Sequence, residues 1–410
     1  MDRLTRRRFL FASGVTAASA LAFGATQVHW SDLFTAAQRD PLKPGQGVLV
    51  VVTLYGGNDG LNTVVPAGDP AYAKARPDLA YQPHEVHDLG QGLGLNPGMT
   101  GFKSLWDGGK LAIVRGVGYP NPDHSHFRSM AIWQTASPTT SVPTGWLGRW
   151  LDTVDDNPLL AVSVDPVLPP LLAGQRTAAV SLPVSGLAIP PGQLGQAFLA
   201  LGDAHSGDSP QVARAARSVV DLDNAVRVLG GAVHDSSLGG AVKGTKTAQP
   251  NNTLGLQLDL VAELIEAGVP TRAYSVSLGG FDTHADEKGT QQRLLTELDQ
   301  ALVPFVQRMQ RTERGQQAVV LVYSEFGRRV TANASEGTDH GTAGPVFLAG
   351  AGIHGGFYGE QPSLTDLNAG DLKESTDFRS IYATLLDKVL GAEPGVVLGD
   401  YSGRIDQVMA

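Results

Sequence analysis

The segment from Ala318 to Gly350 constrains the fold most, because two apolar runs flank a polar loop within it. Ala318 to Tyr323 is short and rich in Val, which is typical of a strand buried on both faces of a parallel sheet. The polar residues that follow it are Glu325, Asn333, Glu336, Asp339 and His340. Pro345 to Ala349 then turns apolar again. Ligands of open α/β sheets bind at the carboxyl edge of the strands, so the segment predicts a sheet and a site together.

Three further apolar runs end in polar residues. Residues 47–54 precede Asp59, residues 111–118 precede Ser125 and His126, and residues 271–278 precede Asp282 and His284. Amphipathic helices are expected over 212–233, 254–268, 294–309 and 381–390. Strands that alternate with helices predict an α/β fold with a mostly parallel sheet, in which these polar residues meet at one edge.

Length and composition restrict the chemistry. With 410 residues, 42% of them hydrophobic, the chain can bury the core of one large α/β domain. The absence of Cys excludes thiolate nucleophiles and Cys-bound metals, so any metal must use oxygen and imidazole ligands. The net charge of -9 offers no basic surface, which excludes nucleic acid as an expected partner.

The N-terminus resembles an export signal. Adjacent arginines at Arg6, Arg7 and Arg8 precede an apolar run from Phe9 to Phe23. The pattern predicts a twin-arginine signal peptide over 1–25, recognised by the twin-arginine export machinery, although a basic amphipathic helix is the alternative. We therefore expect a periplasmic or extracellular protein with no stable membrane span after cleavage. Residues 26–46 form a lead-in and 47–410 the main domain, with 139–252 as an insertion or substrate-side subregion.

Each polar residue at a strand end also has a structural explanation. Asp59 suits a turn with its neighbouring glycines, Ser125 suits a helix N-cap, and Asp282 suits a capped turn. Their shared placement instead favours a site for one or two divalent ions, for which zinc, manganese, magnesium and calcium are the candidates. The expected ligands are Asp59, Asp282, His284, Glu325, Asp339 and His340. Ser125 is the candidate nucleophile, and His126 beside it is a candidate base or ligand.

Five segments together resemble a known family, domain-of-unknown-function family 1501 (DUF1501), exported bacterial proteins grouped with the alkaline phosphatase and sulfatase superfamily. The segments are LYGGNDGLNTVVP, HSHFRSMAIWQTA, SLGGFDTH, VYSEFGRRVTANASEGTDHGTAGPVFLAG and TDFRSIYATLLDKVLG. The resemblance implies an alkaline-phosphatase-like α/β/α sandwich with a metal site at the carboxyl edge. It assigns metal binding to Asp59, Asp282, His284, Glu325 and His340, and the nucleophile position to Ser125.

Two departures from the superfamily pattern matter for function. Glu325-Phe326 replaces the usual Asp-His, and Asp282 and His284 are closer in sequence than the usual pair, which argues against a second metal. The residues around Ser125 lack a formylglycine motif, which disfavours that type of sulfatase. Arg328 and Arg329 offer either contacts to an oxyanion or ordinary surface ion pairs.

The expected function is metal-dependent hydrolysis of phosphate or sulfate esters, with a small-molecule or polymer ester as substrate. Either Ser125 or a metal-activated water attacks. The alternative is a non-catalytic envelope or surface protein that keeps the fold and binds a glycan, a polymer or a protein partner.

Overall fold

The structure is a computed structural model that describes residues 26–28, 37–38, 41–154, 157–165, 167–182, 187–189, 216 and 253–409. The chain divides into two compact units. The larger unit comprises 44–142, 246–266 and 272–410, and the smaller one comprises the remaining segments. Each unit is described separately below.

The larger unit is built on a mostly parallel sheet whose strands run in the order β15-β6-β14-β11-β2-β10, with β16 also paired to β6. The strands are β2 (Val48–Leu54), β6 (Leu111–Gly118), β10 (Ala273–Leu278), β11 (Ala318–Ser324), β14 (Gly344–Gly350), β15 (Gly356–Tyr358) and β16 (Thr376–Asp377). The central strand β2 pairs in parallel with both β10 and β11. Only β14 runs against its two neighbours, β11 and β6.

This topology confirms the predicted α/β fold with a mostly parallel sheet. Every residue of β2 is buried, as expected for the central strand of such a sheet. Because β14 is antiparallel to both β11 and β6, those two strands point the same way. The carboxyl ends of β2, β6, β10 and β11 therefore lie at one edge, as the sequence pattern predicts.

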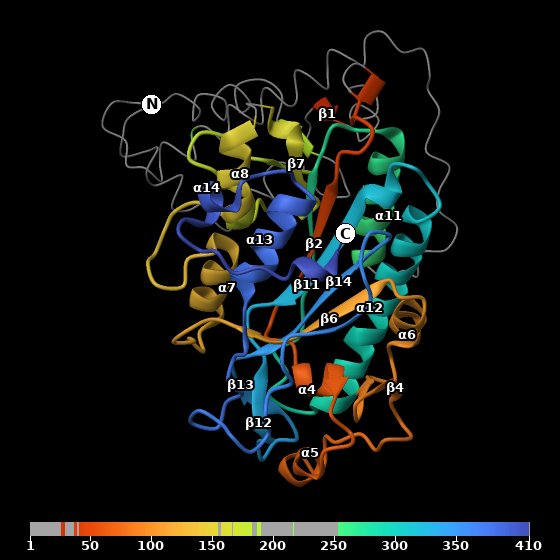
Figure 1. Cartoon of the computed structure of the whole chain (residues 1–410), viewed down its shortest axis with the longest axis vertical. Helices are drawn as coiled ribbons and strands as arrows, with labels where there is room; N and C mark the ends of the chain where they lie inside the picture. Colours follow the sequence, from red (N-terminus) through yellow and green to blue (C-terminus); the bar gives the residue numbers. More distant parts are fainter. Residues whose placement is uncertain are drawn as a thin grey trace. The chain divides into compact units, whose positions relative to one another are not determined.

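Helices cover both faces of the sheet. They are α4 (Gly60–Thr63), α5 (Pro70–Ala75), α6 (Thr100–Asp107), α7 (His126–Thr135), α11 (Thr253–Ala267), α12 (Glu287–Met309), α13 (Phe378–Lys388) and α14 (Pro394–Leu398), with short 3-10 turns at η4 (Gly315–Gln317) and η5 (Asp406–Val408). Figure 1 shows α6, α11 and α12 on one side of the strands and α7 and α13 on the other. The expected helix over 294–309 is the later part of α12, which contains Pro304.

Aromatic contacts confirm the two helical layers. Phe102 on α6 meets Phe347 on β14 edge to face at 5.4 Å. Trp133 on α7 stacks on Tyr323 of β11 at 5.0 Å. Val322 pairs directly with Phe347, so Tyr323, one residue further along, faces the opposite side of the sheet. The unit is thus an α/β/α sandwich.

Two small sheets extend from the same unit. They are β3 (Val64–Val65), β4 (His87–Gly90) and β5 (Leu93–Leu95) in one, and β12 (Arg328–Ala332) with β13 (Thr338–His340) in the other. The β12-β13 hairpin occupies the polar loop between β11 and β14, and it pairs Arg328 with His340.

The smaller unit contains short elements: β1 (Thr26–Val28), α8 (Trp146–Val154), η1 (Pro158–Leu160), β7 (Ala161–Ser163), η2 (Pro170–Leu172), β8 (Val180–Ser181) and β9 (Leu187–Ile189). Here β1 pairs antiparallel with β9, and β7 pairs in parallel with β8. The predicted signal peptide over 1–25 and the expected helix over 212–233 lie outside the described residues, apart from Ala216. Much of the predicted subregion over 139–252 also does, and it stays a prediction.

Among the described helices, none combines the length and the apolar character that crossing a membrane requires.

Candidate metal centre

A turn that contains two glycines follows β2 and allows other segments to approach the carboxyl edge of the sheet closely. Gly56 and Gly57 have φ angles of 117° and 72°, which side chains with a Cβ rarely adopt. A Cβ on Gly56 would lie 2.5 Å from the backbone nitrogen of Asp282, and one on Gly57 would lie 2.2 Å from the Phe326 ring. The two glycines therefore allow the segments after β10 and β11 to approach the end of β2.

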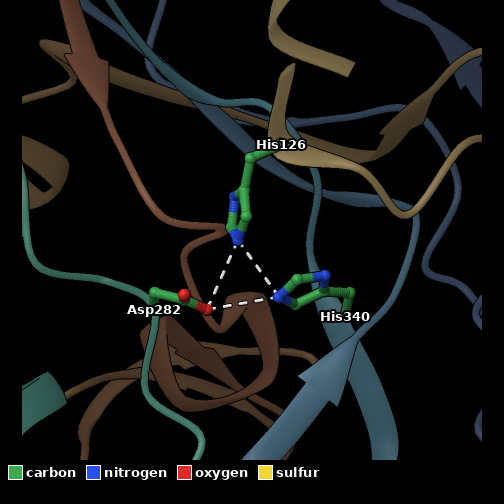
Figure 2. A group of neighbouring side chains, drawn as sticks. All are labelled: His126, Asp282 and His340. Carbon is green, nitrogen blue, oxygen red and sulfur yellow. Dashed lines mark hydrogen bonds and ion pairs between the residues drawn. The ribbon is translucent and has the colours of Figure 1, made fainter. Parts of the chain in front are cut away.

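Three side chains from distant parts of the sequence point at one another here: His126 at the start of α7, Asp282 after β10 and His340 at the end of β13 (Figure 2). The His126 Nε2 atom lies 3.1 Å from His340 Nε2 and 3.4 Å from Asp282 Oδ1. His340 Nε2 lies 3.2 Å from the same Asp282 oxygen. Three potential ligand atoms thus surround one point.

The outer nitrogens of the two imidazoles fix which atoms face that point. His126 Nδ1 lies 2.8 Å from Glu325 Oε1, and His340 Nδ1 lies 2.7 Å from the backbone carbonyl of His124. A carboxylate and a carbonyl only accept hydrogen bonds, so both Nδ1 atoms carry the proton and donate it. In the neutral rings, both Nε2 atoms therefore present lone pairs toward each other and toward Asp282.

Two facing lone pairs and a carboxylate oxygen repel unless a proton or a cation lies between them. Burial is the largest effect on the His340 imidazole. It lowers the pKa of this side chain below its ordinary value and so disfavours its charged form. The separations of 3.1, 3.2 and 3.4 Å bracket the roughly 3.3 Å between neighbouring ligands of a tetrahedral zinc ion with bonds of about 2.0–2.1 Å. The three residues fit a divalent cation.

His284 adds a third imidazole beside this group. Its Nε2 atom lies 2.9 Å from His340 Nε2 and 2.9 Å from Asp282 Oδ1. Its Nδ1 atom faces Asp339 at 3.6 Å, and the Asn333 amide donates to that carboxylate at 3.3 Å. Asp282 and His284, two residues apart in sequence, thus meet at one place.

Glu325 lies behind His126, and its side chain is only 2% exposed. Its Oε1 atom accepts from the Gly56 backbone N–H at 2.9 Å as well as from His126. Its Oε2 atom accepts from the Ser324 hydroxyl at 2.9 Å. Glu325 and Asp339, both predicted ligands, each face the Nδ1 atom of a histidine in this cluster, and their binding of a metal stays a prediction.

Ser125 caps α7, in agreement with the structural alternative for this residue. Its hydroxyl accepts from the Arg128 backbone N–H at 3.5 Å, and its side chain is exposed directly beside His126. A cap at 3.5 Å is weak, because good hydrogen bonds to a hydroxyl are shorter. The role of Ser125 as a nucleophile stays a prediction.

Asp59 is not a member of the group of three and is fully buried. Its Oδ1 atom accepts from the Leu61 backbone N–H at 3.2 Å, and its Oδ2 atom pairs with the Arg76 guanidinium. Burial is the largest single effect and would raise its pKa, but the charge of Arg76, its hydrogen bond to Asp59 and the nearby charge of Arg328 help to outweigh burial, and the pKa is lowered. These contacts give no support to the prediction that Asp59 binds the metal.

Arg328 is a part of the site whose role the sequence did not reveal. Its side chain is buried and donates to the carbonyls of Gly56, Gly57, Phe281 and Thr338 and, at 2.8 Å, to Asp282 Oδ1. Each of its three nitrogens donates to an acceptor within the protein, and the side chain is fully buried, so Arg328 forms no ordinary surface ion pair. Arg329 is 42% exposed and lies 3.5 Å from Asp371.

Arg328 also sets the charge of Asp282. Burial, the largest effect, would raise the pKa of this carboxyl, but the hydrogen bond from Arg328 and the positive charge of its guanidinium help to outweigh it, and the pKa is lowered to about 2. Asp282 is therefore ionised at any physiological pH and supplies a permanent negative charge to the group.

Comparisons with known proteins give a family and several distant structures. A family model described as "Protein of unknown function (DUF1501)" matches residues 201–406. No curated protein matches the sequence. Similar solved structures include a murine ectonucleotide pyrophosphatase/phosphodiesterase 5, inactive and in complex with AMP. It has a TM-score of 0.38 and 9% identity, over 84% of this chain and 95% of that chain.

Two further structures are similarly distant. A TAB5 alkaline phosphatase mutant with magnesium at its M3 site has a TM-score of 0.32 and 10% identity, over 77% of this chain and 95% of that chain. The 2-O GAG sulfatase BT1596 has a TM-score of 0.31 and 10% identity, over 76% of this chain and 66% of that chain. With TM-scores below 0.5, these structural similarities say nothing about the activity of this chain.

Proposed function

The chain belongs to the DUF1501 family, and on that premise we propose that it is a metal-dependent hydrolase of phosphate or sulfate esters. Its metal ligands are His126, Asp282 and His340. The observation that carries the proposal is the orientation of the two imidazoles, whose Nδ1 protons are held by Glu325 and by the His124 carbonyl. Their Nε2 lone pairs converge on Asp282 as a result.

The donor set favours zinc among the four candidate ions. Imidazole nitrogens suit zinc, whereas magnesium and calcium prefer sites built from oxygen atoms. His284 is the further ligand in this proposal, because its Nε2 atom lies 2.9 Å from two members of the group. It serves either the same ion or a second one.

The site has room for a substrate, because the side chains of Asp282 and His284 are 50% and 46% exposed. When bound, a divalent cation polarises an ester and lowers the pKa of a hydroxyl or water that it contacts. Ser125 supplies the attacking hydroxyl in the leading form of the proposal, and water attacks in the other. The N-terminus of the ten-residue helix α7 favours the negative charge of the ester group beside it.

Export by the twin-arginine route is a separate proposal that rests on the sequence of residues 1–25. The machinery carries folded proteins, so the metal centre would form before transport. Replacing Arg6, Arg7 and Arg8 by Lys should retain the precursor in the cytoplasm, whereas replacing Arg3 alone should not. Secretion of the triple variant at the normal rate would contradict this route.

Elemental analysis of the full chain tests the metal, and turnover tests the reaction. The protein should contain stoichiometric metal after purification without chelators, and Asp282→Asn and His340→Ala should lack it. A panel of phosphate and sulfate esters should then be hydrolysed only by the metal-loaded wild type. Bound metal without turnover of any ester would overturn the hydrolase and favour the non-catalytic binding protein. Absence of metal even after addition of zinc or manganese would overturn the centre itself.

A further inference from the structure

The tip of the β12-β13 hairpin packs against the segment that carries His284. The hairpin tip comprises residues 333–337, between the end of β12 and the start of β13. The Asp286 backbone N–H donates to the Ser335 carbonyl at 3.2 Å. A Cβ on Gly337 would lie 2.2 Å from the carbonyl carbon of His284, so this approach requires a glycine. The hairpin tip thus fixes the backbone of a residue beside the proposed metal centre.

The side chain of Asn333 connects the hairpin tip to His284. Its Oδ1 atom accepts from the Ser335 backbone N–H at 2.8 Å and from the Gly337 backbone N–H at 3.2 Å. Because an amide oxygen only accepts hydrogen bonds and an amide nitrogen only donates them, these two contacts fix the orientation of the amide. Its Nδ2 atom donates to the His284 carbonyl at 3.0 Å and to Asp339 Oδ1 at 3.3 Å.

The three imidazoles of the cluster differ in how firmly their outer nitrogens are held. The contacts of His126 Nδ1 and His340 Nδ1 are 2.8 and 2.7 Å long. His284 Nδ1 instead lies 3.6 Å from Asp339, whose side chain is 59% exposed. Within the part of the chain that the structure describes, the Asn333 amide is the only hydrogen-bond donor to the Asp339 carboxylate. The orientation of the His284 ring therefore depends on Asn333 more than on any buried acceptor.

We infer that Asn333 positions His284 as a ligand of the proposed metal centre, through the His284 carbonyl on one side and the Asp339 carboxylate on the other. Asn333 acts only through these two residues, so it is a positioning residue. Its effect on metal binding rests on the proposed function, whereas its effect on the order of the His284 ring does not.

Loss of the Asn333 amide would release His284 at two places, its backbone and its ring. The ring is 46% exposed, so few neighbours would keep it in place. The contacts that hold His126 and His340 do not involve Asn333. We therefore expect a centre that keeps its group of three ligands, binds metal less tightly and lacks the contribution of His284.

NMR spectra of the metal-free full chain with isotope-labelled histidine test the order of the ring. The His284 ring should give one narrow set of signals in the wild type and broadened or multiple signals in Asn333→Ser. His354, an exposed histidine outside the centre, should give the same signals in both. Equal His284 signals in wild type and variant would overturn the inference, whether or not the protein binds metal. Loss of order in the variant of a protein that binds no zinc would overturn the metal centre instead.

Zinc affinity, measured by chelator competition, tests whether Asn333 acts through His284. Asn333→Ser should weaken zinc binding by about tenfold, whereas the same change at the exposed Asn368 should leave it unaltered. In a His284→Ala background, Asn333→Ser should change the affinity by less than about twofold, because an effect carried by His284 disappears with it. A further tenfold loss in that background would overturn the inference, since Asn333 would then act on the other ligands or on the fold.

Asn333→Asp separates the amide donor from the turn. Its carboxylate can still accept from the Ser335 and Gly337 N–H groups, but it cannot donate to His284 or Asp339. The added negative charge would by itself strengthen binding of a cation. We nevertheless expect a disordered His284 ring and weaker zinc binding in this variant. Tighter zinc binding with an ordered ring would overturn the inference, and this outcome can be measured even if Asn333→Ser fails to fold.

Discussion

His126 Nδ1 and Glu325 Oε1 lie 2.8 Å apart, and this contact joins the start of α7 to the end of β11. The Glu325 carboxylate is itself fixed by the Gly56 backbone N–H and by the Ser324 hydroxyl. An imidazole held by an immobile acceptor has one orientation and one tautomer. The contact therefore decides that His126 presents Nε2 to the proposed metal, and it explains why a carboxylate at the end of β11 can matter without binding the ion.

Glu325→Gln should weaken zinc binding by about 10–100-fold, the usual effect of changing a residue that orients a metal ligand. Gln can accept from His126 but lacks the charge that strengthens the bond. Calorimetric titration of the metal-free protein measures the change, with the exposed Glu336→Gln as control. Complete loss of zinc would show instead that Glu325 contacts the ion directly.

Asp282→Asn should abolish stoichiometric metal, because it removes the only carboxylate of the proposed group of three. Asp339→Asn is the matched change at a carboxylate that faces the outer nitrogen of His284 at 3.6 Å and accepts from the Asn333 amide. It should reduce affinity by no more than about tenfold. Elemental analysis measures the metal bound to each variant. Equal losses of metal in the two variants would place Asp339 among the ligands.

Ser125 has two separable roles. Ser125→Ala removes both the cap of α7 and the candidate nucleophile, whereas Ser125→Asn keeps a good capping residue without a hydroxyl. Ser125→Ala should lower the free energy of unfolding by about 0.5 kcal/mol, the low end for a cap because the contact is long, and Ser125→Asn should restore it. If Ser125 attacks the ester, both variants lose turnover. Retention of most of the rate by either one would favour a water nucleophile.

Arg76→Ala should lower the free energy of unfolding by about 3–5 kcal/mol, because it leaves the buried Asp59 without its charged partner. Arg311→Ala, at an exposed position, should change it by less than about 0.5 kcal/mol. Urea denaturation at pH 7 provides both values. A small effect at Arg76 would mean that Asp59 becomes protonated or finds other donors.

The free energy of unfolding should also depend on pH through Glu287. Its pKa is raised from 4.5 to about 9 on folding, so the folded state keeps a proton that the unfolded chain releases. The stabilisation from this proton is complete below about pH 4.5 and is lost as the pH rises through about 9. Urea denaturation of wild type and Glu287→Gln should therefore give a difference that grows in favour of the variant over this range. A constant difference would contradict the shifted pKa.

Local patterns were sufficient to predict much of the fold. Continuous apolar runs predicted β2, β6, β10, β11 and β14, and the placement of Asp282, His284 and His340 after such runs predicted that they would meet. The sequence did not distinguish the side chains that face the proposed metal position from those that contact the outer nitrogens of the histidines. Glu325 and Asp339 looked equivalent to Asp282, because a carboxylate in a loop gives no sign of which imidazole nitrogen it will meet.

The sequence by itself determined the α/β class, the shared edge of the strands and the absence of Cys ligands, since these follow from periodicity and composition. Only the tertiary structure decided that Asp59 pairs with Arg76, that Arg328 is buried and that Glu287 accepts from the Thr338 hydroxyl. These pairings join residues from separate segments, and their charge states depend on burial and on neighbours across the fold. The physical reason is that solvation and contact are properties of the packed chain.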